Sequence, residues 1–243
     1  MIYDLYRRLR LKLYGAYDGS VDIVALHDHR LLYFAVPKVA NTSVKVALSK
    51  AIDPELQTWA EDQSRKSSFL RDPDLRPELY RKGILLNKFA ADGYRHYARW
   101  TFVRNPWDRL VSCYSDKVMR EMVHRGMADS FAKHAEYRPQ MPFDDFAMVV
   151  CRMSEKEANR HFRSQYTFLI DRRGKLLPGE IGRFETLAED FDRMCRSVGV
   201  GEISLPTFKA TKHREYRDYY TATLRDQVAE RYRRDIEMFG YSF

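Results

Sequence analysis

Cysteine is scarce in this sequence, and its positions argue against two common stabilising devices. The 243 residues include three cysteines, which are odd in number, far apart and nowhere in C-x-x-C spacing: Cys113, Cys151 and Cys195. A disulfide framework needs an even set, and a structural zinc site needs closely spaced ligands. The pattern is instead typical of a protein in a reducing compartment, and we expect no metal.

Long apolar runs are also missing. No stretch of ~18 apolar residues occurs, so the sequence predicts no membrane-spanning helix. The first residues, MIYDLYRRLRLKLYG, are unlike a signal peptide because arginines interrupt any apolar core. Their apolar members recur at helical spacing, which predicts an amphipathic helix over residues 1–20 packed on the domain. The alternative is a peripheral contact of residues 1–14 with an anionic membrane surface.

Charge of one sign is not gathered in any block. The chain has 42 Lys and Arg against 34 Asp and Glu, a net charge of +8, which favours polyanionic or multiply phosphorylated partners. Basic and acidic residues are interspersed, as in RRDIE and AEDFDRM, so a nucleic-acid-binding protein is the weaker interpretation. The length and the hydrophobic share of 44% predict one domain over residues 1–243.

Strand and helix patterns alternate along the chain. This alternation predicts an α/β fold with a central, mostly parallel sheet flanked by helices in three layers. The charged or proline-broken stretches 53–83 and 123–142 are expected to be excursions from this core. The expected strands are Val21–Ala25, Leu31–Val36, Trp100–Val103 and Glu180–Phe184, and the expected helices are Thr42–Lys50, Pro106–Glu121, Phe143–Met153, Leu187–Val198 and Thr221–Phe239.

Glycine is absent from the first turn of chemical interest, in LLYFAVPKVANTSVKVALSK, residues 31–50. An apolar run stops at Pro37-Lys38, and a helical pattern follows. Backbone N–H groups and the positive end of the helix dipole favour an anion there, and Lys38, Thr42 and Ser43 add a charge and two hydroxyls. The missing glycines exclude an ordinary Walker-A loop. The alternative is a plain turn with polar helix caps.

A second strand–turn–helix pattern lies in RWTFVRNPWDRLVSCYSDKV, residues 99–118. Asn105 can cap the helix, and Pro106 suits its first position. Arg104 precedes the helix and Ser112 lies two turns inside it, so a guanidinium and a hydroxyl could hold one phosphate. The alternative for Arg104 is an ion pair at the sheet edge. Two anion sites at two strand ends predict a ligand with phosphates at both ends.

The motifs PKVANTS and FVRNPWDRLVSCYSDK together resemble the 5′-phosphosulfate loop and the 3′-phosphate motif of sulfotransferases that use 3′-phosphoadenosine 5′-phosphosulfate (PAPS). The resemblance is strongest to the carbohydrate group, which includes chondroitin 4-O-sulfotransferases, and it covers about residues 31–243. It is supported by NRHFRSQYTFL, IGRFETLAEDF, TKHREYRDYYT and ERYRRDIEMFGYSF, which are similar to later segments of that group.

This resemblance implies a P-loop-like fold and a reaction. The enzyme would move a sulfuryl group from PAPS to a hydroxyl of a glycan and release 3′-phosphoadenosine 5′-phosphate (PAP), without a metal. The candidate acceptors are an acidic polysaccharide and a glycolipid. Lys38 would contact the 5′-phosphate and neutralise the charge of the leaving group. The implied cofactor-binding residues are Lys38, Val39, Ala40, Asn41, Thr42 and Ser43 at the 5′ end, Arg104 and Ser112 at the 3′-phosphate, and Arg214 over the cofactor.

A base must take the proton of the acceptor hydroxyl, and histidine suits this role at neutral pH. The resemblance favours His161, with Gln165 as a candidate sugar ligand. His96 is the next candidate, eight residues before Arg104. A histidine in the core or on the surface without a catalytic role is the alternative, as is a solvated charge for Arg214.

The chain departs from the family pattern in three places. Asn41 stands where members often have cysteine, IDRRG replaces a C-x-x-C, and the amino-terminal anchor of the Golgi enzymes is missing. We therefore expect a cytoplasmic enzyme of bacterial type, at most peripheral to the inner membrane face. No oligomeric state is predicted. The rival classes are an ATP-using kinase with a P-loop-like fold and a non-catalytic nucleic-acid binder.

Overall fold

The computed structural model describes residues 23–52, 79, 81–82, 84–86, 88, 90–119, 138, 140–171, 173–206 and 214–243. The described residues belong to two compact units, each assembled from separate stretches of the chain. The sheet unit contains Val21–Arg104 and Leu169–Ala210, and the helical unit contains Asn105–Phe168 and Thr211–Phe243. The predicted helix over 1–20 lies outside the described residues, as do most of 53–83 and 123–142. The prediction of a single domain stays a prediction.

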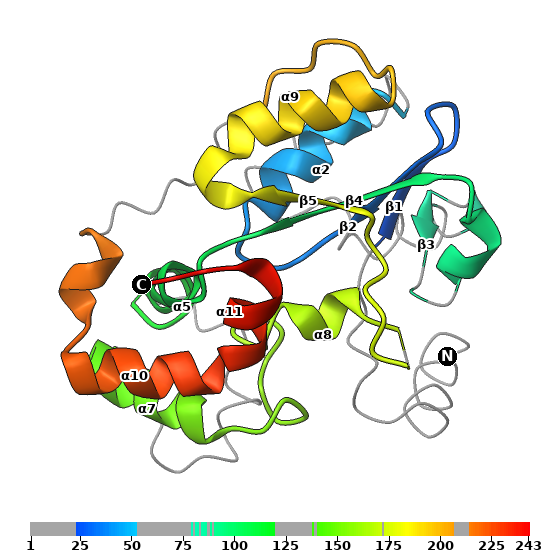
Figure 1. Ribbon diagram of the computed structural model, residues 1–243. Helices are drawn as coiled ribbons and strands as arrows, with labels where there is room; N and C mark the ends of the chain where they lie inside the picture. The colour runs from blue at the N-terminus through cyan, green and yellow to red at the C-terminus, as the bar shows by residue number, and fades with distance from the viewer. Residues whose placement is uncertain are drawn as a thin grey trace. The chain divides into compact units, whose positions relative to one another are not determined.

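The sheet unit contains five strands in the order β3-β1-β2-β4-β5 (Figure 1). Strands β1 and β2 consist of IVAL and LLYF and are fully buried, as expected of short apolar runs inside a sheet. The bounds are β1 Ile23–Leu26, β2 Leu31–Phe34, β3 Leu85–Leu86, β4 Ala98–Val103 and β5 Glu180–Arg183.

The predicted central sheet is present but mixed, because one strand, β1, runs against the other four. Strand β4 pairs in parallel with β2 and with β5, but β1 pairs antiparallel with both β2 and β3. Residues 27–30 alone connect β1 to β2. A parallel pair needs a crossover of a dozen or more residues, so this short turn permits only an antiparallel hairpin. The predicted α/β class is confirmed, while the P-loop-like, three-layer detail stays a prediction.

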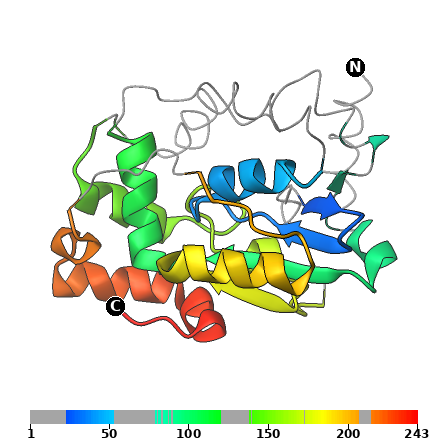
Figure 2. The same ribbon diagram turned by 90° about the horizontal axis from the view of Figure 1, so that it is seen from above.

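Two helices cover the same face of the sheet, α2 (Asn41–Ser49) and α9 (Leu187–Ser197), as Figures 1 and 2 show from two directions. Helix α2 is buried at every residue from Ser43 to Ser49, whereas α9 buries only Phe191, Met194 and Cys195. Two short 3₁₀ helices complete the regular structure described in this unit, Ala90–Tyr94 (η3) and Phe184–Thr186 (η4).

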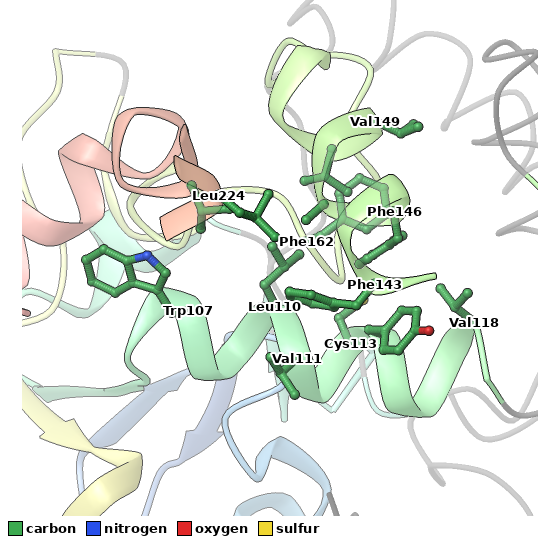
Figure 3. Packing of buried hydrophobic residues seen from close by; sticks show 14 of the residues in the cluster. Trp107, Leu110, Val111, Cys113, Val118, Phe143, Phe146, Val149, Phe162 and Leu224 are labelled. Atoms are coloured by element: carbon green, nitrogen blue, oxygen red, sulfur yellow. The ribbon is translucent and has the colours of Figure 1, made fainter. Parts of the chain in front are cut away.

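The helical unit is organised around one apolar cluster. Figure 3 labels Trp107, Leu110 and Val111 of α5 and Phe143 and Phe146 of α7, all of them buried members of this cluster. Aromatic edges meet ring faces within the cluster, a geometry that adds to the energy of burial. The elements are α5 Pro106–Lys117, α7 Phe143–Arg152, η5 Tyr216–Tyr219, α10 Ala222–Arg231 and α11 Arg233–Phe239, while α8 (Tyr166–Leu169) spans the boundary between the units.

The last predicted helix is really two helices. The predicted span 221–239 is interrupted at Tyr232, where φ is −110° and ψ is 19°. The Tyr232 N–H still donates to Val228 O and its carbonyl accepts from Ile236 N–H, so the apolar spacing continues across the break. Gly240, with φ of 63°, ends α11 as predicted. Within the described ranges, no helix has both the length and the apolar character needed to cross a bilayer.

Candidate functional site

The turn between β2 and α2 adopts a backbone that normally calls for glycine. Lys38 has φ of 70° and Ala40 has φ of 56°, although both carry a side chain. A left-handed conformation costs roughly 1–2 kcal/mol for a residue with a Cβ, and such residues cluster at functional sites. Ala40 occupies the N-cap position of α2, where no side chain accepts a hydrogen bond from the helix. The turn is therefore shaped for something other than local stability.

The first turn of α2 suits an anion. The first N–H groups of a helix have no intrahelical acceptor, and they carry the positive end of the helix dipole. No acidic residue lies in this first turn. Thr42 is exposed there, and Ser43 is buried with 7% of its surface accessible. These features match the predicted cradle for a phosphate.

A buried tyrosine positions Asn41, the first residue of α2. The Tyr33 hydroxyl donates to Asn41 Oδ1 over 3.3 Å, and the Tyr33 ring meets the edge of Phe102, with 6.1 Å between ring centroids. Burial raises the pKa of Tyr33, so the phenol stays neutral and remains a donor. This contact was not predicted from the sequence. Tyr33 lies within an apolar run, and nothing in the run indicates that its hydroxyl reaches the next element.

Arg104 follows β4 at the edge of the sheet where β2 ends. Because β2 and β4 are parallel and Phe34 is opposite Thr101, the turns after both strands emerge at the same edge. Arg104 Nη1 donates to the Lys38 carbonyl oxygen over 3.4 Å. The structure thus brings together one residue from each of the two predicted phosphate motifs, Lys38 and Arg104.

The guanidinium of Arg104 lies over an aromatic ring. Its Cζ lies 3.8 Å from the centroid of Phe184, the first residue after β5, and Arg104 is 7% exposed. Stacking on a ring fixes the plane of the guanidinium and directs its N–H groups along that plane. Such a preorganised fork suits bidentate recognition of a phosphate. Phe184 was part of a motif in the sequence, but its role in stacking was not predicted.

The remaining predicted residues, Ser112, His161 and Arg214, lie in the helical unit. Ser112 is 4% exposed on α5. Arg214 is exposed, and its Cζ lies 4.9 Å from the centroid of the Tyr219 ring. The contact of Ser112 with the 3′-phosphate and that of Arg214 with the cofactor stay predictions.

His161 lies in an irregular loop, residues 153–165, whose carbonyl groups accept hydrogen bonds from buried side chains. Arg109 Nη1 donates to Arg163 O over 2.8 Å, and its Nη2 donates to Arg160 O over 3.4 Å. The Tyr232 hydroxyl donates to Phe162 O over 2.5 Å. Arg109 and Tyr232 are each 2% exposed. A loop without regular structure is thereby fixed from within, which is a requirement for a precise catalytic site.

A buried carboxylate holds the end of the same loop. Asp235 accepts from the N–H groups of Gln165 and Tyr166 over 2.7 and 2.8 Å, and it is completely buried. Burial raises the pKa of Asp235 to about 6, against the opposing effect of these hydrogen bonds and of Arg109. Gln165, the candidate sugar ligand, is itself completely buried. Its contact with a sugar therefore stays a prediction.

An ion pair also supports this loop. Arg231 Nη1 lies 2.6 Å from Glu155 Oε1, and Glu155 also accepts from the hydroxyl of Ser164. Burial, the largest single effect, would raise the pKa of Glu155, but the hydrogen bonds from Arg231 and Ser164 and the charge of Arg231 together outweigh it and lower that pKa. This pair was not predicted from the sequence, because its two residues lie 76 positions apart along the chain.

His96, the second candidate base, is exposed and precedes β4. Arg104 follows the same strand, so the length of β4 separates the two residues. His96 therefore lies at the opposite edge of the sheet from Lys38 and Arg104. In the part of the chain that the structure describes, no three His, Cys, Asp or Glu side chains are grouped as metal ligands.

Comparison with known proteins gives a consistent result. A family model described as "Sulfotransferase family" matches residues 21–242. The chain is 24% identical over 246 residues to carbohydrate sulfotransferase 11 of Rattus norvegicus, covering 90% of this chain and 67% of that one. It is also 24% identical over 249 residues to carbohydrate sulfotransferase 10 of Xenopus laevis, covering 88% and 65%. No solved structure matches the chain.

Proposed function

The chain belongs to the sulfotransferase family, and from this membership we propose that it transfers a sulfuryl group from PAPS to a hydroxyl of a carbohydrate. One observation in the structure supports the proposal above others. Lys38, on a strained turn before an uncapped helix, lies beside the stacked guanidinium of Arg104 at the carboxyl edge of the sheet. A cofactor with a 5′-phosphosulfate and a 3′-phosphate requires two neighbouring anion sites of this kind.

The proposed reaction is a direct displacement at sulfur. The acceptor oxygen forms a bond to sulfur while the bond from sulfur to the 5′-phosphate oxygen breaks, and PAP leaves with the bonding electrons. The Lys38 ammonium neutralises the charge that develops on this bridging oxygen. The backbone N–H groups from Val39 to Thr42, with the hydroxyls of Thr42 and Ser43, hold the 5′-phosphate. Positioning and electrostatic stabilisation then supply most of the rate enhancement, as in phosphoryl transfer.

We assign the 3′-phosphate to Arg104 and Ser112, and a closing contact over the cofactor to Arg214. His161 takes the proton of the acceptor hydroxyl as that oxygen attacks, since a histidine can be unprotonated near neutral pH and still accept a proton. Each of these roles is a proposal about one residue, and each can be tested separately.

A glycan acceptor is proposed from the names of the relatives, which are carbohydrate sulfotransferases. The net charge of +8 is consistent with an acidic saccharide or a glycolipid with an anionic headgroup. These relatives come from animals, so they lend no support to the expectation of a bacterial, cytoplasmic enzyme. That expectation stays a prediction.

The decisive experiment measures transfer of labelled sulfate from PAPS to a panel of glycan fractions that includes acidic polysaccharides and glycolipids. Incorporation into at least one fraction is expected. In parallel, PAP should raise the melting temperature far more than AMP, ATP or an oligonucleotide at equal concentration, because ligand binding to the native state stabilises it. Equal shifts with ATP would favour the kinase alternative, and a shift with the oligonucleotide alone would favour a nucleic-acid binder.

A further inference from the structure

The side chain of Asn159 makes two contacts with His161 through a single atom. Asn159 Oδ1 lies 3.0 Å from the backbone nitrogen of His161 and 2.7 Å from its ring atom Nδ1. The first contact closes an Asx turn, in which an asparagine bonds to the backbone two residues ahead. The second folds the imidazole back over that turn.

These two contacts together determine which ring nitrogen carries the proton. A backbone N–H can only donate, so the asparagine atom that faces it must be the carbonyl oxygen and not the amide nitrogen. The same oxygen faces Nδ1, and an oxygen of this kind can only accept. Nδ1 of His161 must therefore be protonated. In the neutral ring the remaining lone pair then lies on Nε2.

We propose that Asn159 is a positioning residue, which holds His161 in the tautomer whose Nε2 accepts the proton of the acceptor hydroxyl. This inference rests on the proposed function, in which His161 is the base. As the acceptor oxygen attacks sulfur, its proton moves to Nε2, and the imidazolium that results still donates from Nδ1 to Asn159. The proton leaves to solvent after PAP departs.

The position of Asn159 is itself fixed by its neighbours. The backbone carbonyl oxygen of Asn159 accepts hydrogen bonds from the backbone N–H groups of Phe162 and Arg163. Arg163 donates from Nε and Nη2 to the carbonyl of Ala158 over 3.1 and 2.9 Å. These bonds hold the backbone at Ala158 and at Asn159. The side-chain oxygen Oδ1 of Asn159 therefore has a fixed base from which it can orient the imidazole ring of His161. The charged residues of this loop are Glu155, Lys156, Glu157, Arg160 and Arg163, and the charged residues that contact it include Arg109 of α5, Arg231 of α10 and Asp235 of α11.

The test uses the full chain and two independent readouts. The first is nitrogen NMR of the histidine rings, with the His161 signal assigned by its loss in His161→Ala, which reports the tautomer without any need for activity. The second is the pH dependence of kcat for sulfate transfer. The variants are Asn159→Ala, which removes the acceptor, and Asn159→Asp, which keeps an acceptor oxygen.

A matched control is available in the same segment. Glu157 Oε2 accepts from the N–H and the hydroxyl of Ser154, so Glu157→Ala removes a local cap that does not involve His161. Its His161 tautomer and its pH profile should equal those of the native chain. Melting temperatures of all variants identify any that fail to fold.

The native chain should show His161 protonated at Nδ1 and unprotonated at Nε2 at high pH. Asn159→Ala should populate the other tautomer and lower kcat by about 10- to 100-fold, the range known for loss of a partner that orients a metal-ligating histidine. Asn159→Asp should keep the tautomer and much of the rate. The carboxylate of Asn159→Asp stabilises the imidazolium and should therefore raise the pKa of His161. As the pH is lowered, kcat of this variant should begin to fall at a higher pH than kcat of the native chain.

The inference is overturned if the native ring is protonated at Nε2, or if Asn159→Ala leaves both the tautomer and the pH profile unchanged. A native pH profile in Asn159→Asp would also contradict it. Failure of the proposed function gives a different result, since transfer of sulfate would then be undetectable while NMR still reports the tautomer. If His161→Ala keeps its turnover in an active enzyme, His161 is not the base and the role assigned to Asn159 is wrong.

Discussion

The helices α2 and α5 each follow a strand and a short turn, but their first turns are built in opposite ways. Helix α5 satisfies its own N-terminus: Asn105 Oδ1 accepts from Trp107 N–H over 3.1 Å, Pro106 occupies the first position, and Asp108 lies in the first turn. Helix α2 has no side-chain cap and no acidic residue in its first turn, and it begins from left-handed Ala40.

The difference separates a helix start that serves stability from one that serves binding. A capped N-terminus with a carboxylate nearby has already used the features that attract an anion. An uncapped one retains them for a ligand. In the second motif the contact with an anion must therefore come from side chains, of which Arg104 is the one already preorganised. The following predictions test this division.

The largest effect is expected at Lys38. If its ammonium stabilises the leaving phosphate, Lys38→Ala should lower kcat by ~10²-fold or more, as for the loss of a charge contact made in the transition state. Lys38→Gly should lose the same activity without loss of stability, because glycine suits the φ of 70°. Steady-state kinetics and urea unfolding measure the two effects. The matched control is Lys175→Ala, an exposed lysine of the same unit. If either Lys38 variant has a turnover close to that of the native chain, Lys38 does not stabilise the leaving phosphate and is only a residue of the turn.

Arg104 should determine the preference for a 3′-phosphate. Arg104→Ala should weaken PAP binding by about 10- to 100-fold, since bonds to charged groups contribute about 1.5–3 kcal/mol, and should leave AMP binding unchanged. Arg104→Lys should recover only part of the loss, because an ammonium lacks the planar fork. Calorimetric titration measures both affinities. Arg193→Ala is the control, since Arg193 also lies over a ring, that of Trp100. Equal losses for PAP and AMP would contradict the assignment.

Asn105 should matter for stability and not for chemistry. Asn105→Ala removes the cap of α5 and the bond from Nδ2 to Ser242 O over 2.8 Å. Loss of an N-cap costs ~1 kcal/mol, and the loss of a buried hydrogen bond adds to this cost. We expect a lower free energy of unfolding in urea, with kcat within a few-fold of native. A loss of turnover as large as that of the Lys38 variants would show that the two helix starts do not differ in role.

The smallest effect is expected from making α2 resemble α5. Thr42→Asp places a carboxylate in the exposed first turn of α2 and should stabilise the helix by about 0.3–1 kcal/mol through its dipole. The same charge should repel the 5′-phosphate, so the chain should melt at a higher temperature and bind PAP more weakly. Thr42→Asn, which adds no charge, is the control. A carboxylate that leaves PAP affinity unchanged would mean that the phosphate does not lie at this helix end.

Local structure was largely predictable from the sequence. The helix expected at Thr42–Lys50 is Asn41–Ser49, and that at Leu187–Val198 is Leu187–Ser197, because apolar spacing and cap residues act within a few positions. The cap by Asn105 was predicted for the same reason and is confirmed. Strand β3 was missed, since the two residues of Leu85–Leu86 are too few to show a period.

What could not be predicted depends on partners that are distant along the chain. The bond from Tyr33 to Asn41 and the stack of Arg104 on Phe184 need the register of the sheet, which no local pattern contains. Asp235 lies in a mixed-charge stretch typical of a solvated surface, yet it is completely buried. The Asx turn of Asn159 is local, because its partner His161 lies only two residues away, yet it was not predicted from the sequence.

The parallel pairing of β4 with β5 has a consequence for how the chain must fold. Residues 104–179 lie between the two strands, and they include α5 and α7 of the helical unit. Strand β4 is synthesised well before β5, so one of its edges lacks its partner and its backbone N–H and C=O groups there are open to pairing with other chains. The entropy of closing a loop rises by only about 0.6 kcal/mol per doubling of its length, so the finished sheet tolerates this insertion well. The late synthesis of β5 therefore affects the kinetics of folding and not the stability of the finished sheet. We expect the nascent chain to be most prone to aggregate between the synthesis of β4 and that of β5.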